Sequence, residues 1–119
     1  MRTYIAHPAE EPLRLGALAT VLDGARWQAL RCWHPDRYDI YHCARAAWRA
    51  QNIPVPYTAI TYQLRRLVDD GNLLAFNDSP RRTREEIAGL YAEARDHVLR
   101  QRPSSPVPPG PAAAMRLTA

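Results

Sequence analysis

The segment from residue 57 to residue 82 constrains the fold of this 119-residue chain more than any other, because helical spacing is followed there by a sharp stop. Apolar side chains recur with the spacing of one helix face, at Ile60, Leu64, Leu67 and Val68. Gly71 stands where a helix commonly ends, and the apolar run Leu73–Phe76 then favours a short strand. Residues 77–80, Asn-Asp-Ser-Pro, are typical of a turn. The segment therefore predicts a helix over 58–70, one strand and a polar turn followed by arginines.

The chain as a whole has the length of one small domain. We expect an irregular lead-in over residues 1–11, a folded domain over 12–102 and a proline-rich flexible tail over 103–119. Helical spacing predicts further helices over residues 12–22, 25–33, 39–51 and 84–101. Asp23-Gly24 interrupts the pattern between the first two of them.

Several residues mark where these helices should begin and end. Asp39 is a typical N-cap, and Asn52 can take the left-handed conformation that terminates a helix. Thr83 and Glu86 have the spacing of a capping box. His34-Pro35-Asp36 should stop the helix before it, because proline disfavours helical backbone in the preceding residue. Helices are therefore expected on both sides of the opening segment.

The charge of the chain favours an acidic partner. Sixteen arginines and no lysine stand against twelve acidic residues, for a formal net charge of +4. Each arginine presents a planar, permanently charged fork that suits phosphate, guanine edges or carboxylates. Nucleic acid is therefore among the partners that this composition favours.

No pattern in the chain indicates an enzyme, a cofactor or a metal centre. A glycine-rich phosphate loop, a nucleophile elbow and paired carboxylates are missing from the sequence. Cys32, His34, His42 and Cys43 could supply zinc ligands, but adjacent side chains diverge on a helix, so packed free thiols are the favoured interpretation. The sequence has no apolar run long enough to cross a bilayer, and we expect a cytoplasmic protein without a membrane partner.

The opening segment and the helices before it resemble the winged helix-turn-helix superfamily, in particular small bacterial repressors of the ArsR type. Leu22–Leu30 is similar to the first core helix of those proteins, Asp39–Gln51 to the second and Thr58–Asp70 to the recognition helix. The resemblance implies a mainly α fold, a winged helix-turn-helix with a short β wing and flanking N- and C-terminal helices. The flanking helices would pair two subunits into a homodimer.

On such a fold the recognition helix would place its polar face in the major groove of DNA. The residues off its apolar stripe are Thr58, Thr61, Tyr62, Arg65 and Arg66. Arg81 and Arg82 follow the turn and, in a wing, would contact the phosphate backbone. The leading hypothesis is therefore a small homodimeric transcriptional regulator that binds double-stranded DNA.

A protein-binding role on the same scaffold is the alternative. A small inhibitor or adaptor encoded by a phage or another mobile element, such as an anti-CRISPR or anti-defence protein, would fit the size and the missing enzyme motifs. Its arginines or its central aromatic residues would then cover a nucleic-acid-binding host protein. The fold alone does not separate the two roles.

Overall fold

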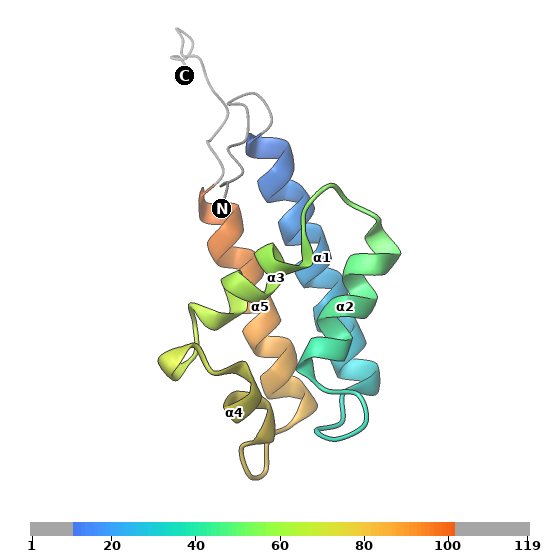
Figure 1. Cartoon of the computed structure of the whole chain (residues 1–119), viewed down its shortest axis with the longest axis vertical. Coiled ribbons are helices and arrows are strands. Elements are labelled where there is room, and N and C mark those ends of the chain that lie inside the picture. Colours follow the sequence, from blue (N-terminus) through green and yellow to red (C-terminus); the bar gives the residue numbers. More distant parts are fainter. Residues whose placement is uncertain (1–10, 102–119) are drawn as a thin grey trace, which may run out of the picture.

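The computed structural model describes residues 11–101, and this part of the chain is built from helices (Figure 1). In chain order they are α1 (Glu11–Cys32), α2 (Ile40–Gln51), α3 (Tyr57–Arg65), the 3-10 turn η1 (Asp69–Gly71), α4 (Leu73–Asp78) and α5 (Arg84–Gln101). No strand occurs within residues 11–101, where the one β-type pairing is an isolated bridge between His34 and Tyr38. The expected lead-in, apart from Glu11, and the expected tail lie outside the described residues.

The two longest helices, α1 and α5, run antiparallel and side by side (Figure 1). Helix α2 packs against α1 in the opposite direction, and α3 lies across the front of the molecule, where it contacts α1, α2 and α5. Helix α4 lies at the lower end, near the start of α2. None of the helices in residues 11–101 is long and apolar enough to cross a membrane.

The helices enclose one apolar core. Its members with no exposed surface include Val21, Leu22, Ile40, Ile60 and Tyr91. The hydroxyl of Tyr91 donates a hydrogen bond to the backbone carbonyl of Ile40, which joins α5 to the first turn of α2. Burial raises the pKa of Tyr91 well above its ordinary value, so the hydroxyl stays neutral and remains a donor.

Helix α1 is continuous, and the interruption expected at Asp23-Gly24 is wrong. The Asp23 carboxylate accepts hydrogen bonds from Arg26 in the same helix, at 3.3 Å, and from Arg95 in α5, at 2.5 Å. Gly24 faces α2 closely, since a Cβ built on it would lie 3.4 Å from the Cβ of Ala47. The two residues thus serve packing between helices and do not form a break.

The expected β wing is also wrong, because Leu73–Phe76 is the start of α4. The side chain of Asn72 accepts a hydrogen bond from the amide of Ala75 at 3.0 Å and so caps this helix. A strand also needs a partner, and the residues that would return are used by α5. The capping box expected there is confirmed, since Thr83 accepts from the Glu86 amide and Glu86 accepts from the Thr83 amide. The mainly α class is therefore right, but the described residues have no wing.

The predicted ends of α2 are confirmed. Asp39 is the N-cap, and its carboxylate accepts from the amide of His42 at 3.0 Å. Asn52 has left-handed backbone angles and ends the helix, with φ 49° and ψ 51°.

Helix α3 is shorter than the 58–70 predicted for it. It ends at Arg65, because the backbone of Val68 is extended and that of Asp70 is left-handed, with φ 56°. Gly71, expected to cap the helix, instead closes η1 with a φ of 65°.

Candidate nucleic-acid interface

The middle of the chain contains no acidic side chain. From Ile40 to Val68, through α2 and α3, there is no Asp or Glu, and the four arginines in this stretch, Arg45, Arg49, Arg65 and Arg66, are all exposed. Within residues 11–101, the ion pairs between arginine and carboxylate involve Arg26, Arg82 and Arg95 instead. The surface of α2 and α3 therefore carries positive charge that no neighbouring carboxylate neutralises.

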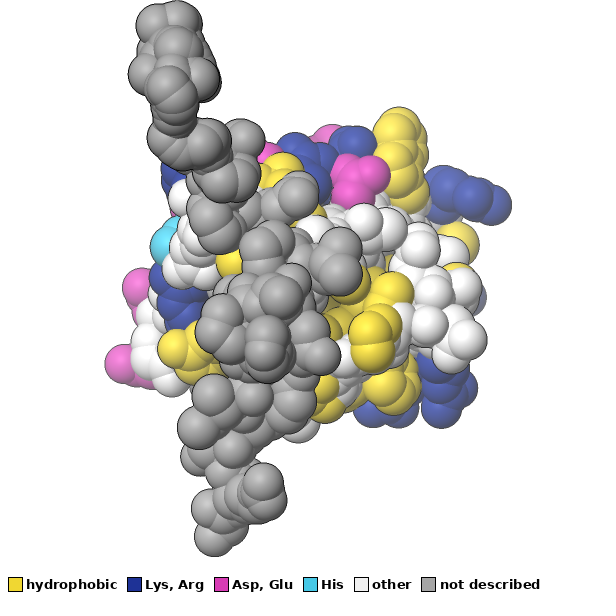
Figure 2. All heavy atoms as spheres, turned by 90° about the horizontal axis from the view of Figure 1, so that it is seen from above, with side chains coloured by type: hydrophobic (Ala, Val, Ile, Leu, Met, Phe, Trp, Pro, Cys, Tyr) yellow, Lys and Arg dark blue, Asp and Glu magenta, His cyan; other side chains and the backbone are white. Residues whose placement is uncertain are grey.

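Helix α2 presents a basic strip along its outer side. His42, Arg45 and Arg49 are exposed and follow each other at intervals of three and four residues, so they lie on one face of the helix. Seen from above, dark blue side chains gather at the right-hand side of the molecule, where α2 lies (Figure 2). The magenta side chains visible in that view lie at its left and top.

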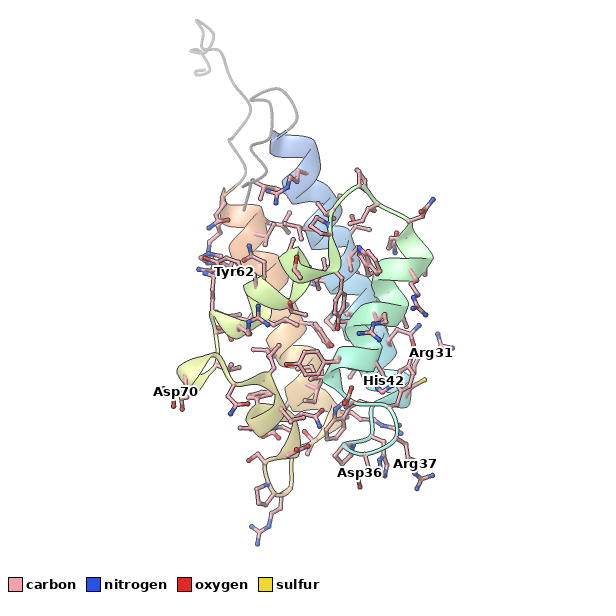
Figure 3. All side chains as sticks on the ribbon, in the orientation of Figure 1. Arg31, Asp36, Arg37, His42, Tyr62 and Asp70 are labelled. Carbon is pink, nitrogen blue, oxygen red and sulfur yellow. The ribbon has the colours of Figure 1, made fainter. Side chains whose placement is uncertain are left out.

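The basic strip continues past the first turn of α2. Arg31 at the end of α1 and Arg37 in the loop before α2 project from the same end of the molecule as His42 (Figure 3). Asp36 projects there too, and the Asp39 carboxylate lies 2.9 Å from the ring nitrogen Nδ1 of His42. This end is therefore mixed in charge, whereas the strip farther along α2 is purely basic.

Tyr57 joins the strip on α2 to the start of α3. Its hydroxyl donates to the carbonyl of Tyr41 at 3.2 Å, and its ring lies 5.0 Å from the guanidinium of Arg45. Burial raises the pKa of Tyr57, while Arg45 acts against this shift. The indole of Trp48 packs on the Tyr57 ring and donates to the carbonyl of Val55 at 2.7 Å. These contacts fix the angle between α2 and α3.

The exposed side of α3 holds three of the residues predicted to bind DNA. Thr58, Tyr62 and Arg65 recur at intervals of four and three, and Tyr62 is 54% exposed. Thr61 does not belong with them, because it is buried and its hydroxyl donates to the carbonyl of Thr58 at 3.2 Å. We call Arg45, Arg49, Thr58, Tyr62 and Arg65 the α2–α3 face.

Arg66 is exposed but held in place. One guanidinium nitrogen donates to Gln63 at 2.9 Å, and another lies 2.6 Å from Nε2 of His97 in α5. The side chain amide of Gln101 also lies 2.9 Å from this ring nitrogen. Arg66 therefore links α3 to α5 and is less available to a ligand than Arg65.

The structure separates the two arginines predicted for the wing from the α2–α3 face. Arg82 donates from Nε to the carbonyl of Phe76 at 2.7 Å, stacks 3.8 Å above the Phe76 ring and pairs with Glu86. Arg81 is exposed in the turn between α4 and α5, with a left-handed φ of 65°. Arg82 is thus a packing residue, and Arg81 is a separate surface charge.

Asn77 positions the loop that precedes α2, and the sequence pattern identifies it only as a turn residue. Its side chain is fully buried. The amide oxygen accepts from the indole of Trp33 at 2.8 Å and from the backbone of Ile40 at 2.9 Å, while the amide nitrogen donates to the carbonyl of Pro35 at 3.1 Å. Asn77 thereby holds both ends of the loop that carries Arg37.

His34 shapes the same loop from inside. Its Nδ1 accepts hydrogen bonds from the backbone amides of Asp36 and Arg37, at 3.1 and 3.2 Å. Arg84 adds a third anchor, donating to the carbonyl of Trp33 at 2.9 Å. The helix stop expected at His34-Pro35-Asp36 is confirmed, since α1 ends at Cys32.

The arginines of α2 and of the loop before it are functional candidates that the sequence pattern did not single out. Attention to the recognition helix left Arg31, Arg37, Arg45 and Arg49 unassigned. The signal that would have found them is the stretch of 29 residues without a carboxylate, from Ile40 to Val68. That stretch includes α2 as well as α3.

The two cysteines differ in their surroundings. Both are free thiols, as expected, but Cys32 is exposed and only Cys43 is packed in the core. Burial raises the pKa of Cys43 to about 12. Residues 11–101 bring no three His, Cys, Asp or Glu side chains together as a metal site.

Comparison with known proteins found no matching family model, no similar curated protein and no similar solved structure.

Proposed function

We propose that the α2–α3 face binds nucleic acid, with double-stranded DNA as the ligand to test first. The observation that carries the proposal is the separation of charge: α2 and α3 hold exposed arginines and no carboxylate. Unpaired like charges repel each other, and a phosphate backbone relieves that repulsion and releases counterions on binding.

The geometry supports a division of work between the two helices. Arg45 and Arg49 lie one helical turn apart along α2 and suit successive phosphate contacts. Thr58, Tyr62 and Arg65 line the exposed side of α3, where an arginine fork and short polar groups can reach base edges or phosphates. In a helix-turn-helix the first helix crosses the backbone while the second enters the major groove, and this arrangement has the same order.

The test is binding of a fluorescent random-sequence duplex across a salt series, with wild type, Arg45→Ala/Arg49→Ala and a matched control. We expect the double substitution to weaken binding about tenfold or more and to reduce the salt slope by about two contacts. Arg81→Ala/Arg100→Ala removes the same charge from exposed sites outside the α2–α3 face and should change affinity by less than about twofold. A wild type that ignores every duplex at low salt, or a control that weakens binding equally, would rule out this site.

The same variants separate DNA binding from binding of a protein partner. In the protein-binding alternative, the arginines cover a nucleic-acid-binding host protein, so a stoichiometric partner should survive nuclease treatment of the lysate. Capture that disappears with nuclease supports the DNA proposal. Homodimer formation through the terminal helices stays a prediction; within one chain α1 and α5 already pack against each other.

A further inference from the structure

A groove between α1 and α5 is the largest hollow found among the described residues. Its volume is about 460 Å³, and Gln51 at the end of α2 closes one side. The floor is formed by small residues of α1, among them Gly16, Ala19, Thr20 and Gly24. The Asp23–Arg95 ion pair also lines it.

The walls of the groove are two of the four large apolar side chains that the described residues expose. Trp27 is 52% exposed and Leu99 is 41% exposed. The guanidinium of Arg26 stacks on the Trp27 ring at 4.5 Å and holds the indole against α1. An exposed tryptophan beside a hollow is the usual form of a peptide-binding site.

The indole N–H of Trp27 has no acceptor among residues 11–101, in contrast to those of the other two tryptophans. Trp33 donates to Asn77, and Trp48 donates to the carbonyl of Val55. Buried or docked tryptophans usually donate this hydrogen, so the groove offers a donor to whatever covers it. A polyproline-type peptide has unpaired backbone carbonyls and fits that donor.

The chain itself supplies such a peptide next to the groove. Residues 102–119 contain five prolines and no acidic residue, and prolines spaced three apart occur at Pro103/Pro106, Pro106/Pro109 and Pro108/Pro111. Helix α5 ends at Gln101, two residues after Leu99, so this segment begins at the groove wall.

The length of the segment suffices to cover the groove. Along α1 the lining residues run from Gly16 to Trp27, which at 1.5 Å per residue is roughly 16 Å. An extended polyproline chain covers that distance with about five or six residues at 3.1 Å each. The 18 residues after Gln101 (119 minus 101) leave enough chain to turn back from the end of α5.

We propose that the proline-rich segment of the same chain docks in the α1–α5 groove, with its prolines on the Trp27 ring and a backbone carbonyl on the Trp27 N–H. Docking within the chain needs no second molecule, so its free energy does not include the loss of translational freedom that association costs. The groove shares none of the residues of the α2–α3 face, and this inference does not rest on nucleic-acid binding.

The test uses the full chain and the three indole N–H signals in a ¹H–¹⁵N spectrum. In Pro106→Ser/Pro108→Ser/Pro109→Ser the Trp27 signal, assigned with Trp27→Phe, should shift toward that of a solvent-exposed indole. The Trp33 and Trp48 signals should stay in place, because Asn77 and Val55 hold those indoles, and they confirm that the variant is folded. Ala112→Ser/Ala113→Ser/Ala114→Ser adds the same three serines to the segment without removing a proline and should leave the Trp27 signal unchanged.

Two results would overturn the proposal. A Trp27 signal that is the same in wild type and in the proline variant means that the segment does not reach the groove. A Trp27 signal that moves toward the exposed position on dilution of the wild type means that a second copy covers the groove instead.

Discussion

At the residue scale, Asn77 determines how the loop before α2 is held. One buried amide satisfies the indole of Trp33, the backbone amide of Ile40 and the carbonyl of Pro35. Asn77→Ala should lower the free energy of unfolding by about 3 kcal/mol or more, because each buried polar group left unpaired costs about 1–3 kcal/mol. Urea unfolding monitored by far-UV circular dichroism measures the loss.

The control for Asn77 is the same substitution at Asn72, which is exposed and caps α4 with one hydrogen bond. Asn72→Ala should cost about 1 kcal/mol. If Asn77→Ala costs no more than Asn72→Ala, the loop does not depend on the buried amide.

Cys43 makes the stability of the protein depend on alkaline pH. Its pKa is raised to about 12 in the folded chain, against 9.0 for the unperturbed thiol. Above pH 9 the unfolded state releases the proton and the folded state keeps it, so stability is full below pH 9 and falls as pH rises toward 12. The fall is about 1.4 kcal/mol per pH unit within that window.

The measurement is the urea midpoint of wild type and of Cys43→Ala at pH 8 and pH 10, under reducing conditions. Wild type should lose about 1.4 kcal/mol more than the variant over this interval. Equal losses in both proteins would mean that the thiol ionises alike in the folded and unfolded states. Tyr91, whose pKa is also raised by burial, contributes in the same direction at higher pH.

At the element scale, helices with local end signals were predictable and short elements without them were not. The Asp39 cap, Asn52 and the Thr83–Glu86 capping box set the ends of α2 and the start of α5 through contacts a few residues apart. The apolar run Leu73–Phe76 fits a strand or a helix equally well by pattern. What decides it is distant: Asn77, one helical turn after Leu73, must be buried to reach Trp33 and Pro35.

The candidate site was predictable only in part, for a similar reason. Thr58, Tyr62 and Arg65 share the exposed side of α3, as the helical spacing predicts. That spacing could not show that Thr61 is buried or that Arg66 contacts His97, because both depend on how α3 crosses α5. The wing arginines were assigned through a strand that the structure does not contain.

At the scale of the whole molecule, the parts that hold the fold together are separate from the charges proposed to bind nucleic acid. Arginine–carboxylate pairs connect α5 to α1 through Arg95 and Asp23, and Arg82 to Glu86 near the start of α5. Arg49 and Arg65 have no such partner in residues 11–101, and Arg45 makes one ring contact with Tyr57. Binding and stability should therefore respond to different arginines.

This separation predicts opposite effects for two sets of substitutions. Arg45→Ala/Arg49→Ala should weaken duplex binding yet change the free energy of unfolding by less than about 1 kcal/mol, because the Arg45–Tyr57 contact is worth about 0.5–1 kcal/mol and Arg49 has no carboxylate to lose. Arg82→Ala should cost about 2 kcal/mol through its lost hydrogen bond and ring stacking at Phe76, while duplex affinity at a temperature where the variant is folded stays within about twofold of wild type. Thermal unfolding and duplex titration of the same preparations give both quantities. A double variant that unfolds as readily as Arg82→Ala would show that the basic strip on α2 supports the fold, and its loss of binding would then say nothing about a nucleic-acid site.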